Sequence, residues 1–337
     1  MDLSSLPFDP DLTPGARNAV QVCLRLRPEE RVTLVADFAA REIAAALVRE
    51  IERVGASYRS FVLEELASRP LQAMPAPVLA DLPRSQVSIF AASAETGELQ
   101  VRIALTEVVT RLGIRHAHMV NITPRIMVEG MRADFGEVDA LSSRLIARAR
   151  EARRMRVTSP AGTDLEAEFS PRLRWIKTSG IITPEKWGNL PGGEIFTAPL
   201  EVNGRFVVDG VVGDYLGRKY GDLRSTPLRV EVRGNRIAGM ECANPELLEE
   251  FRAYTSTDEN SDRVGEFALG TNTAVRDVCG NILQDEKIPG VHVAFGHPYA
   301  QHTGADWISS THIDCVGRHF DVWMDGEPVM RAGQYLV

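Results

Sequence analysis

The stretch GVHVAFGHPYAQHTGADWISSTHIDCV, residues 290–316, contains the densest group of chemically active side chains in this chain of 337 residues. It includes four of the seven histidines, together with a tyrosine and an aspartate: His292, His297, Tyr299, His302, His312 and Asp314. Two short runs in it, residues 291–296 and 311–316, are rich in β-branched and aromatic residues and are bounded by glycine or polar residues, which predicts two strands. The stretch therefore predicts a β-rich C-terminal domain.

Side chains two residues apart on a strand point to the same face of the sheet. His312 and Asp314 therefore share a face, and His292 shares a face of its own strand with the small residues Ala294 and Gly296. Two imidazoles and a carboxylate beside free space are typical ligands of a divalent metal ion. A buried, hydrogen-bonded His–Asp pair would give the same pattern, so the pair alone leaves both interpretations open.

The composition is that of a globular protein, with 44% apolar and 25% charged residues, and the length predicts two domains or one large one. A formal net charge of −8 without any basic run argues against a nucleic-acid partner. No apolar run reaches the roughly 18 residues of a membrane span, so no membrane partner is expected. The N-terminus lacks the features of a secretory signal, and the four cysteines have no CxxC spacing. We therefore expect reduced thiols and a cytoplasmic protein.

Residues 1–152 are expected to form an α/β domain with a mainly parallel sheet. Predicted strands (31–37, 58–65, 85–93, 116–123) alternate with predicted helices (39–55, 102–113, 124–131, 137–155). The first strand is not followed by GxGxxG, and the chain has no GxxxxGK[ST], so no nucleotide cofactor is expected. His116 and His118 lie near the end of the fourth strand. They are either polar strand-end residues or a proton-transfer or substrate-binding pair.

Residues 153–337 are expected to form the second domain, which is β-rich and carries the metal site. Hairpins are predicted for residues 155–170, for residues 193–212 with Asn203-Gly204 as the turn, and for residues 227–242 with Gly234-Asn235 as the turn. One helix over residues 245–255 interrupts the strands. The predicted fold class is therefore α/β for the first domain plus α+β for the second.

Two glutamates, Glu194 and Glu266, extend the candidate metal site. Each follows a glycine and opens an apolar strand, and glycine lets the backbone approach another group closely. A charged residue at a strand end can equally cap the strand in solvent. If both glutamates face His292, His312 and Asp314, the five donors suit two ions about 3.5–4 Å apart that share a carboxylate. We expect all five within a few ångströms of one point.

Four segments, LPGGEIFTAP (190–199), GEFALGTN (265–272), ILQDEK followed by HVAFGHPY (282–299) and STHIDCV (310–316), resemble the aminopeptidase T and aminopeptidase S type metallopeptidases. These segments lie within about residues 155–320. The resemblance implies a site for two divalent ions such as Zn, Co or Mn, and it implies a homodimer whose active sites face an enclosed cavity. The implied ligands are Glu194, Glu266, His292, His312 and Asp314, with Tyr299 nearby.

The chain also departs from that pattern. It is shorter than typical members of the peptidase branch, the gap between His292 and His312 is tighter, and Gln284 stands where many relatives have a glutamate. The same scaffold includes the 2,5-dihydroxypyridine 5,6-dioxygenases, in which two histidines and an aspartate hold a single Fe(II). The His–Asp pair fits either branch, whereas the presence of both Glu194 and Glu266 favours two ions.

The expected function is a metal-dependent hydrolase that resembles leucyl aminopeptidase and cleaves a small peptide or amide with a metal-activated water. Tyr299 is the candidate hydrogen-bond donor to the tetrahedral oxyanion, and Glu194 or Glu266 is the candidate general base. Two alternatives are a mononuclear Fe(II) dioxygenase that cleaves the ring of 2,5-dihydroxypyridine and a non-catalytic protein with a structural metal site. His297 and His302 are expected in a loop, in solvent or beside the ligands.

Overall fold

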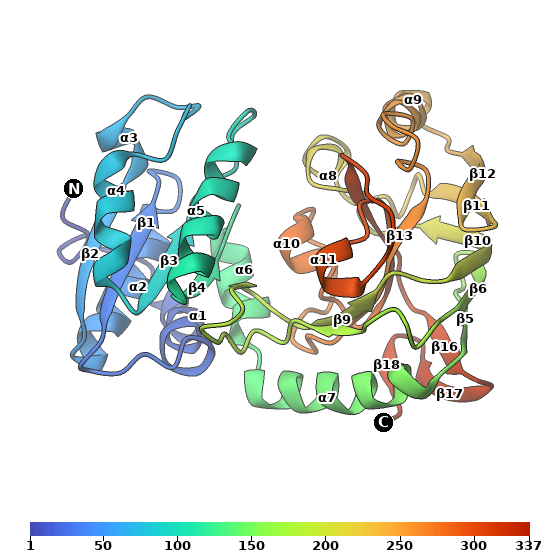
Figure 1. The fold of residues 1–337 in the computed structure, drawn as a ribbon, viewed down its shortest axis with the longest axis horizontal. Helices are drawn as coiled ribbons and strands as arrows, with labels where there is room; N and C mark the ends of the chain where they lie inside the picture. Colours follow the sequence, from blue (N-terminus) through green and yellow to red (C-terminus); the bar gives the residue numbers. More distant parts are fainter. The chain divides into compact units, whose positions relative to one another are not determined.

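The computed structural model describes all residues, Met1–Val337, and the chain forms two compact units (Figure 1). Unit 1 comprises Met1–Phe135 and Gly180–Gly192, and unit 2 comprises Gly136–Ser179 and Gly193–Val337. This grouping differs in two segments from the predicted division after residue 152. The helix α7 (Phe135–Glu151) belongs with unit 2 because Leu141, Leu145 and Ala149 are buried in the core of that unit. The segment from Gly180 returns to unit 1.

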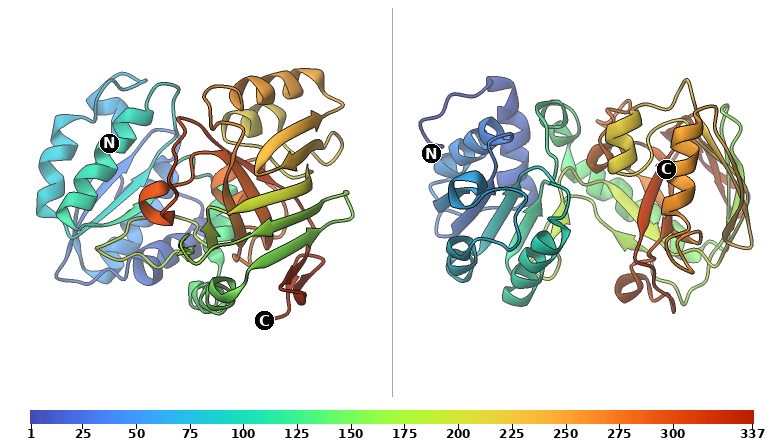
Figure 2. Two further views of the ribbon diagram at one scale, coloured as in Figure 1. Left: turned by 45° about the vertical axis from the view of Figure 1, so that its right-hand side comes forward. Right: turned by 90° about the horizontal axis from the view of Figure 1, so that it is seen from above.

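Unit 1 is built on a parallel five-stranded sheet, as predicted. The strand order is β2 (Ser57–Val62), β1 (Arg31–Ala36), β3 (Val87–Ala91), β4 (Arg115–His118) and β8 (Gly188–Asn189), and every neighbouring pair is parallel. The helix α2 (Arg41–Val54) lies on one face of the sheet, and α4 (Ala76–Asp81) and α5 (Leu99–Leu112) lie on the other (Figure 2). The strand β3 is buried along its whole length, as expected for a strand covered on both faces.

Short helical segments complete unit 1: η1 (Pro10–Leu12), α1 (Thr13–Arg17), η2 (Asn18–Cys23), α3 (Leu63–Leu66), η3 (Leu82–Arg84), α6 (Pro124–Val128) and η4 (Gly130–Arg132).

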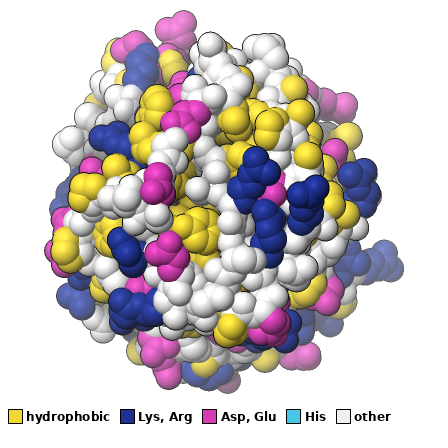
Figure 3. All heavy atoms as spheres, turned by 90° about the vertical axis from the view of Figure 1, so that its left-hand side faces the viewer, with side chains coloured by type: hydrophobic (Ala, Val, Ile, Leu, Met, Phe, Trp, Pro, Cys, Tyr) yellow, Lys and Arg dark blue, Asp and Glu magenta, His cyan; other side chains and the backbone are white.

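None of the helices in the chain combines the length and the hydropathy that a membrane-spanning segment requires. The four cysteines are free thiols. On the face shown in Figure 3, several basic side chains gather around an acidic one, and elsewhere both signs are interspersed with apolar side chains.

Unit 2 contains two antiparallel sheets, which confirms the predicted fold class. The larger sheet has the order β12 (Arg236–Glu241), β11 (Leu228–Arg233), β10 (Glu201–Val208), β6 (Asp164–Glu168), β5 (Arg154–Thr158), β16 (Asp321–Met324), β17 (Glu327–Arg331) and β18 (Gln334–Tyr335). The smaller sheet has the order β15 (His312–Val316), β14 (Gly290–Gly296), β13 (Val264–Gly270), β9 (Glu194–Thr197) and β7 (Ile176–Lys177). The helices of this unit besides α7 are α8 (Tyr215–Tyr220), α9 (Pro245–Tyr254), α10 (Ile282–Asp285) and α11 (Ala300–Thr303).

Two of the three predicted hairpins are confirmed, β5–β6 and β11–β12. The hairpin predicted at Asn203-Gly204 is wrong, because both residues lie inside β10 and pair with Glu166 and Leu165 of β6. The preceding strand β9 pairs with β13 and β7 in the other sheet. The chain therefore crosses from one sheet to the other between β9 and β10 and does not turn back on itself.

One apolar core joins the two sheets of unit 2 and fixes the strands of the smaller sheet. The rings of Phe206 and Phe320 stack with their centroids 5.8 Å apart, and Phe251 of α9 meets Phe295 of β14 edge-on at 6.1 Å. In β9, β13 and β14 every residue is buried. Polar side chains on these strands therefore need partners inside the protein.

We predict that Gly270→Ala destabilises the fold by about 1–3 kcal/mol, the usual range for overpacking. A Cβ at Gly270 would lie 2.0 Å from the carbonyl oxygen of Ile288, so two backbone segments would have to separate. The matched control is Gly239→Ala in β12, where a Cβ would lie 3.8 Å from its nearest neighbour, and where a change within about 0.5 kcal/mol is expected. Urea unfolding measures both, and equal effects would contradict the prediction.

Candidate metal centre

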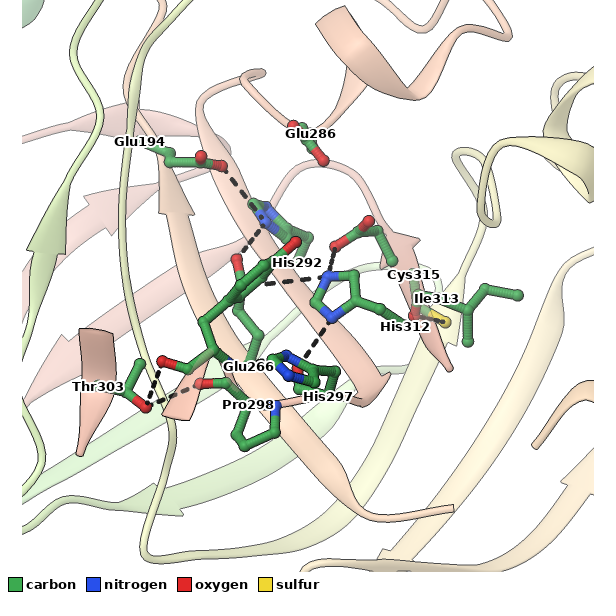
Figure 4. A network of polar contacts seen from close by, with 12 residues as sticks. Glu194, Glu266, Glu286, His292, His297, Pro298, Thr303, His312, Ile313 and Cys315 are labelled. Carbon is green, nitrogen blue, oxygen red and sulfur yellow. Dashed lines mark hydrogen bonds and ion pairs between the residues drawn. The ribbon is translucent and has the colours of Figure 1, made fainter. Parts of the chain in front are cut away.

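The smaller sheet of unit 2 brings together the five donors expected from the sequence. Four of them, Glu194, Glu266, His292 and His312, are labelled in Figure 4. They come from four neighbouring strands: Glu194 from β9, Glu266 from β13, His292 from β14, and His312 and Asp314 from β15. Side chains on adjacent strands of an antiparallel sheet lie close together when they share a face. In the register of these strands Ala294 pairs with both Glu266 and Asp314, and Ala268 pairs with His292, so the donors share one face of the sheet.

Glycines allow the segments that carry the donors to touch through their backbones. A Cβ at Gly193, which precedes Glu194, would lie 2.7 Å from the Cβ of Asn272, and one at Gly270 would lie 2.0 Å from the carbonyl oxygen of Ile288. Hydrogen bonds join the same segments, from Thr271 N–H to the Gly193 carbonyl at 2.7 Å and from Asn272 N–H to the Lys287 carbonyl at 3.0 Å. The glycines therefore fix the spacing of the donors.

His292 lies at the centre of the group and is 2% exposed. Its Nε2 atom is 3.4 Å from Oε1 of Glu266 and 3.6 Å from Oε2 of Glu194. This buried nitrogen has no hydrogen-bond partner. The nearest donor atoms of these three residues lie within 4.8 Å of one another, so the residues fit a divalent cation.

His312 and Asp314 form the other side of the group. Nε2 of His312 lies 3.3 Å from Oδ1 of Asp314 and 3.8 Å from Oε2 of Glu266. Its Nδ1 lies 2.9 Å from the carbonyl oxygen of His297, so the ring donates from Nδ1 and keeps Nε2 free as a ligand when it is neutral. Both sides of the group therefore meet at Glu266.

Glu286 and Lys287 also lie at the site, and neither was predicted from the sequence. Glu286 forms a second potential ion-binding group with His292 and Asp314, again within 4.8 Å. Lys287 is 1% exposed, and its ammonium group contacts Glu286 and lies 2.7 Å from Oε1 of Glu194. Both residues belong to the ILQDEK segment, residues 282–287. A glutamate and a lysine in a short segment just before β14 were the available signal.

A buried aspartate holds the segment that carries Glu286. The carboxylate of Asp285 accepts hydrogen bonds from the backbone N–H groups of Cys279, Gly280 and Asn281 at 2.8–2.9 Å. These bonds tie the end of α10 to the loop before it. The direction in which Glu286 projects therefore depends on a neighbour that does not reach the metal site.

Tyr299 lies against the histidine side of the group. Its ring centroid is 4.9 Å from that of His312 and 5.4 Å from that of His297. Tyr299 adopts a left-handed backbone conformation with φ 49°, which is uncommon for a residue with a bulky side chain. Its backbone N–H donates to Nδ1 of His297 at 3.0 Å. An unusual backbone conformation in this place suits a residue that the site must present in one orientation.

The turn that follows Tyr299 is fixed by Arg174 and Thr303. The guanidinium of Arg174 donates to the carbonyl oxygens of His302 at 2.6 Å and Gln301 at 3.1 Å. The backbone N–H of Arg174 donates to the carbonyl oxygen of Thr303 at 2.7 Å. The hydroxyl of Thr303 donates to the carbonyl oxygen of Pro298 at 2.7 Å. His302 thus contributes to this turn through its backbone, and its side chain is exposed.

Burial and mutual charge shift the pKa values of the donors. Burial alone would lower the pKa of both histidines, but the neighbouring carboxylates raise the pKa of His292 to about 9 and that of His312 to about 10. Burial opposes ionisation of Asp314, yet His312 lowers its pKa to about 2. Burial, with repulsion from Glu194 and Asp314, raises the pKa of Glu286 to about 8. Before an ion binds, protons on the imidazoles compensate the carboxylates.

His116 and His118 lie in unit 1, on β4. Nδ1 of His116 shares a hydrogen bond with Oγ of Ser88 at 2.8 Å, and its Nε2 lies 3.2 Å from Nδ1 of His118. The ring of His118 stacks on Phe90 at 5.1 Å and meets Trp187 edge-on at 5.5 Å. Burial lowers the pKa of His116 to about 3. These contacts favour two neutral histidines packed within the sheet.

We predict that the metal-free protein loses stability as the pH rises through about 9 to 10. The raised pKa values mean that the folded chain holds protons on His292 and His312 more tightly than the unfolded chain. This contribution is fully present below the ordinary histidine pKa of about 6.5 and is lost as the pH passes the folded-state values. Thermal unfolding in a chelator at about pH 6, 8 and 10 measures the loss.

A divalent ion must displace the same protons, so ion binding should release protons and should strengthen as the pH rises. Calorimetry in buffers with different ionisation enthalpies measures the release. A melting temperature that stays constant over this pH range, together with no proton release, would show that both imidazoles are already neutral.

The fold of the chain is similar to that of two solved structures. The structure of 2,5-dihydroxypyridine dioxygenase from Pseudomonas putida KT2440 matches with a TM-score of 0.70 at 16% sequence identity and covers 97% of each chain. Wild-type AmpT from Thermus thermophilus matches with a TM-score of 0.68 at 19% identity and covers 97% of this chain and 99% of that chain. At these identities the similarity shows a shared fold.

A search of curated proteins found no match to the sequence. The family model of the thermophilic metalloproteases (M29), in contrast, matches residues 141–318, which is more than half of the chain. This range contains all five expected donors as well as Glu286, Lys287 and Tyr299. The chain therefore belongs to the thermophilic metalloprotease (M29) family.

Proposed function

We propose that the protein is a metal-dependent aminopeptidase that removes N-terminal residues from small peptides or hydrolyses small amides. The observation that carries this proposal is the group of five buried or half-buried donors, in which the buried Nε2 of His292 faces Glu194 and Glu266 and has no hydrogen-bond partner. Membership of a metalloprotease family supports it. A homodimer and a cytoplasmic location, which the sequence led us to expect, are further parts of the proposal.

The donor set suits two divalent ions. Glu194, Glu266, His292, His312 and Asp314 would hold them, and Glu266 faces both histidines and is placed to be shared. Such ions, for which Zn, Co and Mn are candidates, lower the pKa of a water molecule and polarise a scissile carbonyl. Five donors are also more than the four that a single Zn²⁺ ion usually takes.

Tyr299 would donate a hydrogen bond from its hydroxyl to the oxygen on which negative charge develops. Burial and the surrounding carboxylates raise its pKa well above the ordinary value, so the hydroxyl keeps its proton at neutral pH. Loss of one such donor typically costs about 2.7–4 kcal/mol of barrier. The two neighbouring rings and the clamped turn after it would keep this hydroxyl in place.

Glu286 would take a proton from the attacking water and pass it to the leaving amine. This carboxyl lies within 4.8 Å of donor atoms of His292 and Asp314 and is not one of the five residues assigned to the ions, so it is placed beside the water that the ions would hold. Glu194 and Glu266 are the residues that the sequence suggested for this role. Both lie against His292, so their oxygen atoms are better placed for the ions.

A second candidate function is that of an Fe(II) dioxygenase acting on 2,5-dihydroxypyridine. The specific observation that favours it is the set of His292, His312 and Asp314, two imidazoles and a carboxylate on two neighbouring strands. Such a triad holds mononuclear iron and leaves positions open for substrate and O₂. The additional carboxylates Glu194 and Glu266 would crowd that iron, which makes the hydrolase the better supported function.

We predict that His312→Ala or Asp314→Ala removes bound metal, because a donor atom is lost outright. His297→Ala and His302→Ala are the matched controls. His297 supports His312 through its carbonyl oxygen, and His302 contacts Arg174 in the same way, so alanine retains both bonds. Metal content after dialysis measures the effect, with at most about a 10–100-fold loss of affinity in the controls. Equal losses in all four variants would mean that the donor set is wrong.

The reaction class is tested by the glutamates and by oxygen uptake. If the protein is the proposed hydrolase, it should cleave unblocked aminoacyl amides, and Glu194→Gln or Glu266→Gln should lower the metal content toward one ion and abolish cleavage. Elemental analysis and a substrate panel measure both effects. Oxygen consumption with Fe(II) and 2,5-dihydroxypyridine, combined with no cleavage across the panel, would establish the dioxygenase instead. Full activity without any metal would exclude both.

A further inference from the structure

Lys287 is a buried cation placed directly beside the donors of the metal centre. Its side chain is 1% exposed, and its ammonium group lies 2.7 Å from Oε1 of Glu194 and also contacts Oε1 of Glu286. A buried ammonium requires such partners, because burial of an unpaired charge is costly. The lysine thus occupies space next to the proposed two-ion site and carries the same sign of charge as the ions.

The donors divide into two sets according to whether Lys287 touches them. Glu194 and Glu286 have one oxygen each engaged by the ammonium group. Glu266, His292, His312 and Asp314 form ion pairs with one another or with Glu194 and none with Lys287, although His292 and Asp314 also lie near Glu286. These four residues supply two imidazoles and two carboxylates, which is a complete donor set for one divalent ion.

Oε1 of Glu194 is doubly engaged. It accepts a hydrogen bond from the hydroxyl of Thr178 at 2.7 Å in addition to the contact with Lys287. Only Oε2 faces His292, at 3.6 Å. An ion held by Glu194 must therefore use Oε2 and lie close to the ammonium group, or it must displace that group. Either route is opposed by charge repulsion, which is strong where water is excluded.

Building on the two-ion site of the proposed function, we propose that Lys287 makes its two positions unequal. The position formed by Glu266, His292, His312 and Asp314 fills first, with a high affinity. The position at Glu194 fills only at a higher metal concentration, because the second ion competes with the ammonium group for the carboxylate of Glu194. The lysine thereby sets the metal concentration at which the centre becomes dinuclear.

The test is a titration of the metal-free, full-length protein with Zn²⁺, followed by calorimetry and by competition with a chelator. The wild type should show two binding steps whose dissociation constants differ by at least about tenfold. Lys287→Met removes the charge and keeps the length of the side chain, and it should tighten the weaker step by at least about tenfold. The tighter step should change by less than about threefold, since its four donors do not contact the lysine.

Two control variants separate charge from hydrogen bonding. Lys287→Arg keeps the positive charge and should keep the two steps unequal. Thr178→Val removes the other hydrogen bond to Oε1 of Glu194 without changing any charge, and it should change the ratio of the two steps by less than about threefold. A Thr178→Val effect as large as that of Lys287→Met would overturn the proposal, because hydrogen bonding would then explain the difference.

The outcomes also distinguish this inference from the proposed function. Two ions that bind the wild type with equal affinity, or a Lys287→Met variant with unchanged steps, overturn the role of the lysine and leave the two-ion site intact. A single ion in both proteins at saturation overturns the two-ion site and this inference with it. If Lys287→Met does not fold, the wild-type titration still decides, since two equal steps contradict the proposal.

Discussion

The structure of unit 2 depends on one constraint, the need to compensate several negative charges inside a protein. Glu194, Glu266, Glu286 and Asp314 approach one another within a single small region, and none of them is exposed. Burial without a partner would cost each carboxylate several kcal/mol or force it to take up a proton. The chain meets this need with two imidazoles and the ammonium group of Lys287. Metal ions would replace the protons on the imidazoles. Protonation and ion binding would therefore both stabilise the fold by compensating the same carboxylates.

This constraint is strongest for the three donors on the inner strands of the smaller sheet, Glu194, Glu266 and His292. Strands β9, β13 and β14 are covered on both faces, so water cannot screen the charges, and electrostatic interactions there are strong. It also explains why small residues flank the donors. Close contact of the backbones around Gly193 and Gly270 leaves little space for water. A catalytic group such as Tyr299 then acts in an environment where its hydrogen bond is worth more.

Much of this arrangement could be predicted from the sequence, and the failures have physical causes. Alternation on strands placed His312 and Asp314 on one face, and the α/β and β-rich architecture followed from the order of apolar runs. The prediction of a turn at Asn203-Gly204 was wrong, because the Asn-Gly pair is only a local signal. It does not reveal that the chain has already moved to the other sheet and continues as one strand. Glu286 and Lys287 were missed because they lie in a short helix-to-strand connection without periodicity. Only the fold brings Lys287 to Glu194, a residue more than ninety positions earlier.

The path of the chain between its units has a consequence for modularity. The chain passes from unit 1 to unit 2 after Phe135, returns at Gly180, and leaves again after Gly192. Neither unit is a continuous piece of sequence, so neither could be exchanged or inherited by joining at a single point. The second segment of unit 1 ends at Gly192, two residues before Glu194, which is the first donor of the metal centre in the sequence. A foreign domain inserted in place of unit 1 would thus alter the anchorage of a metal ligand, which ties the evolution of the two units together.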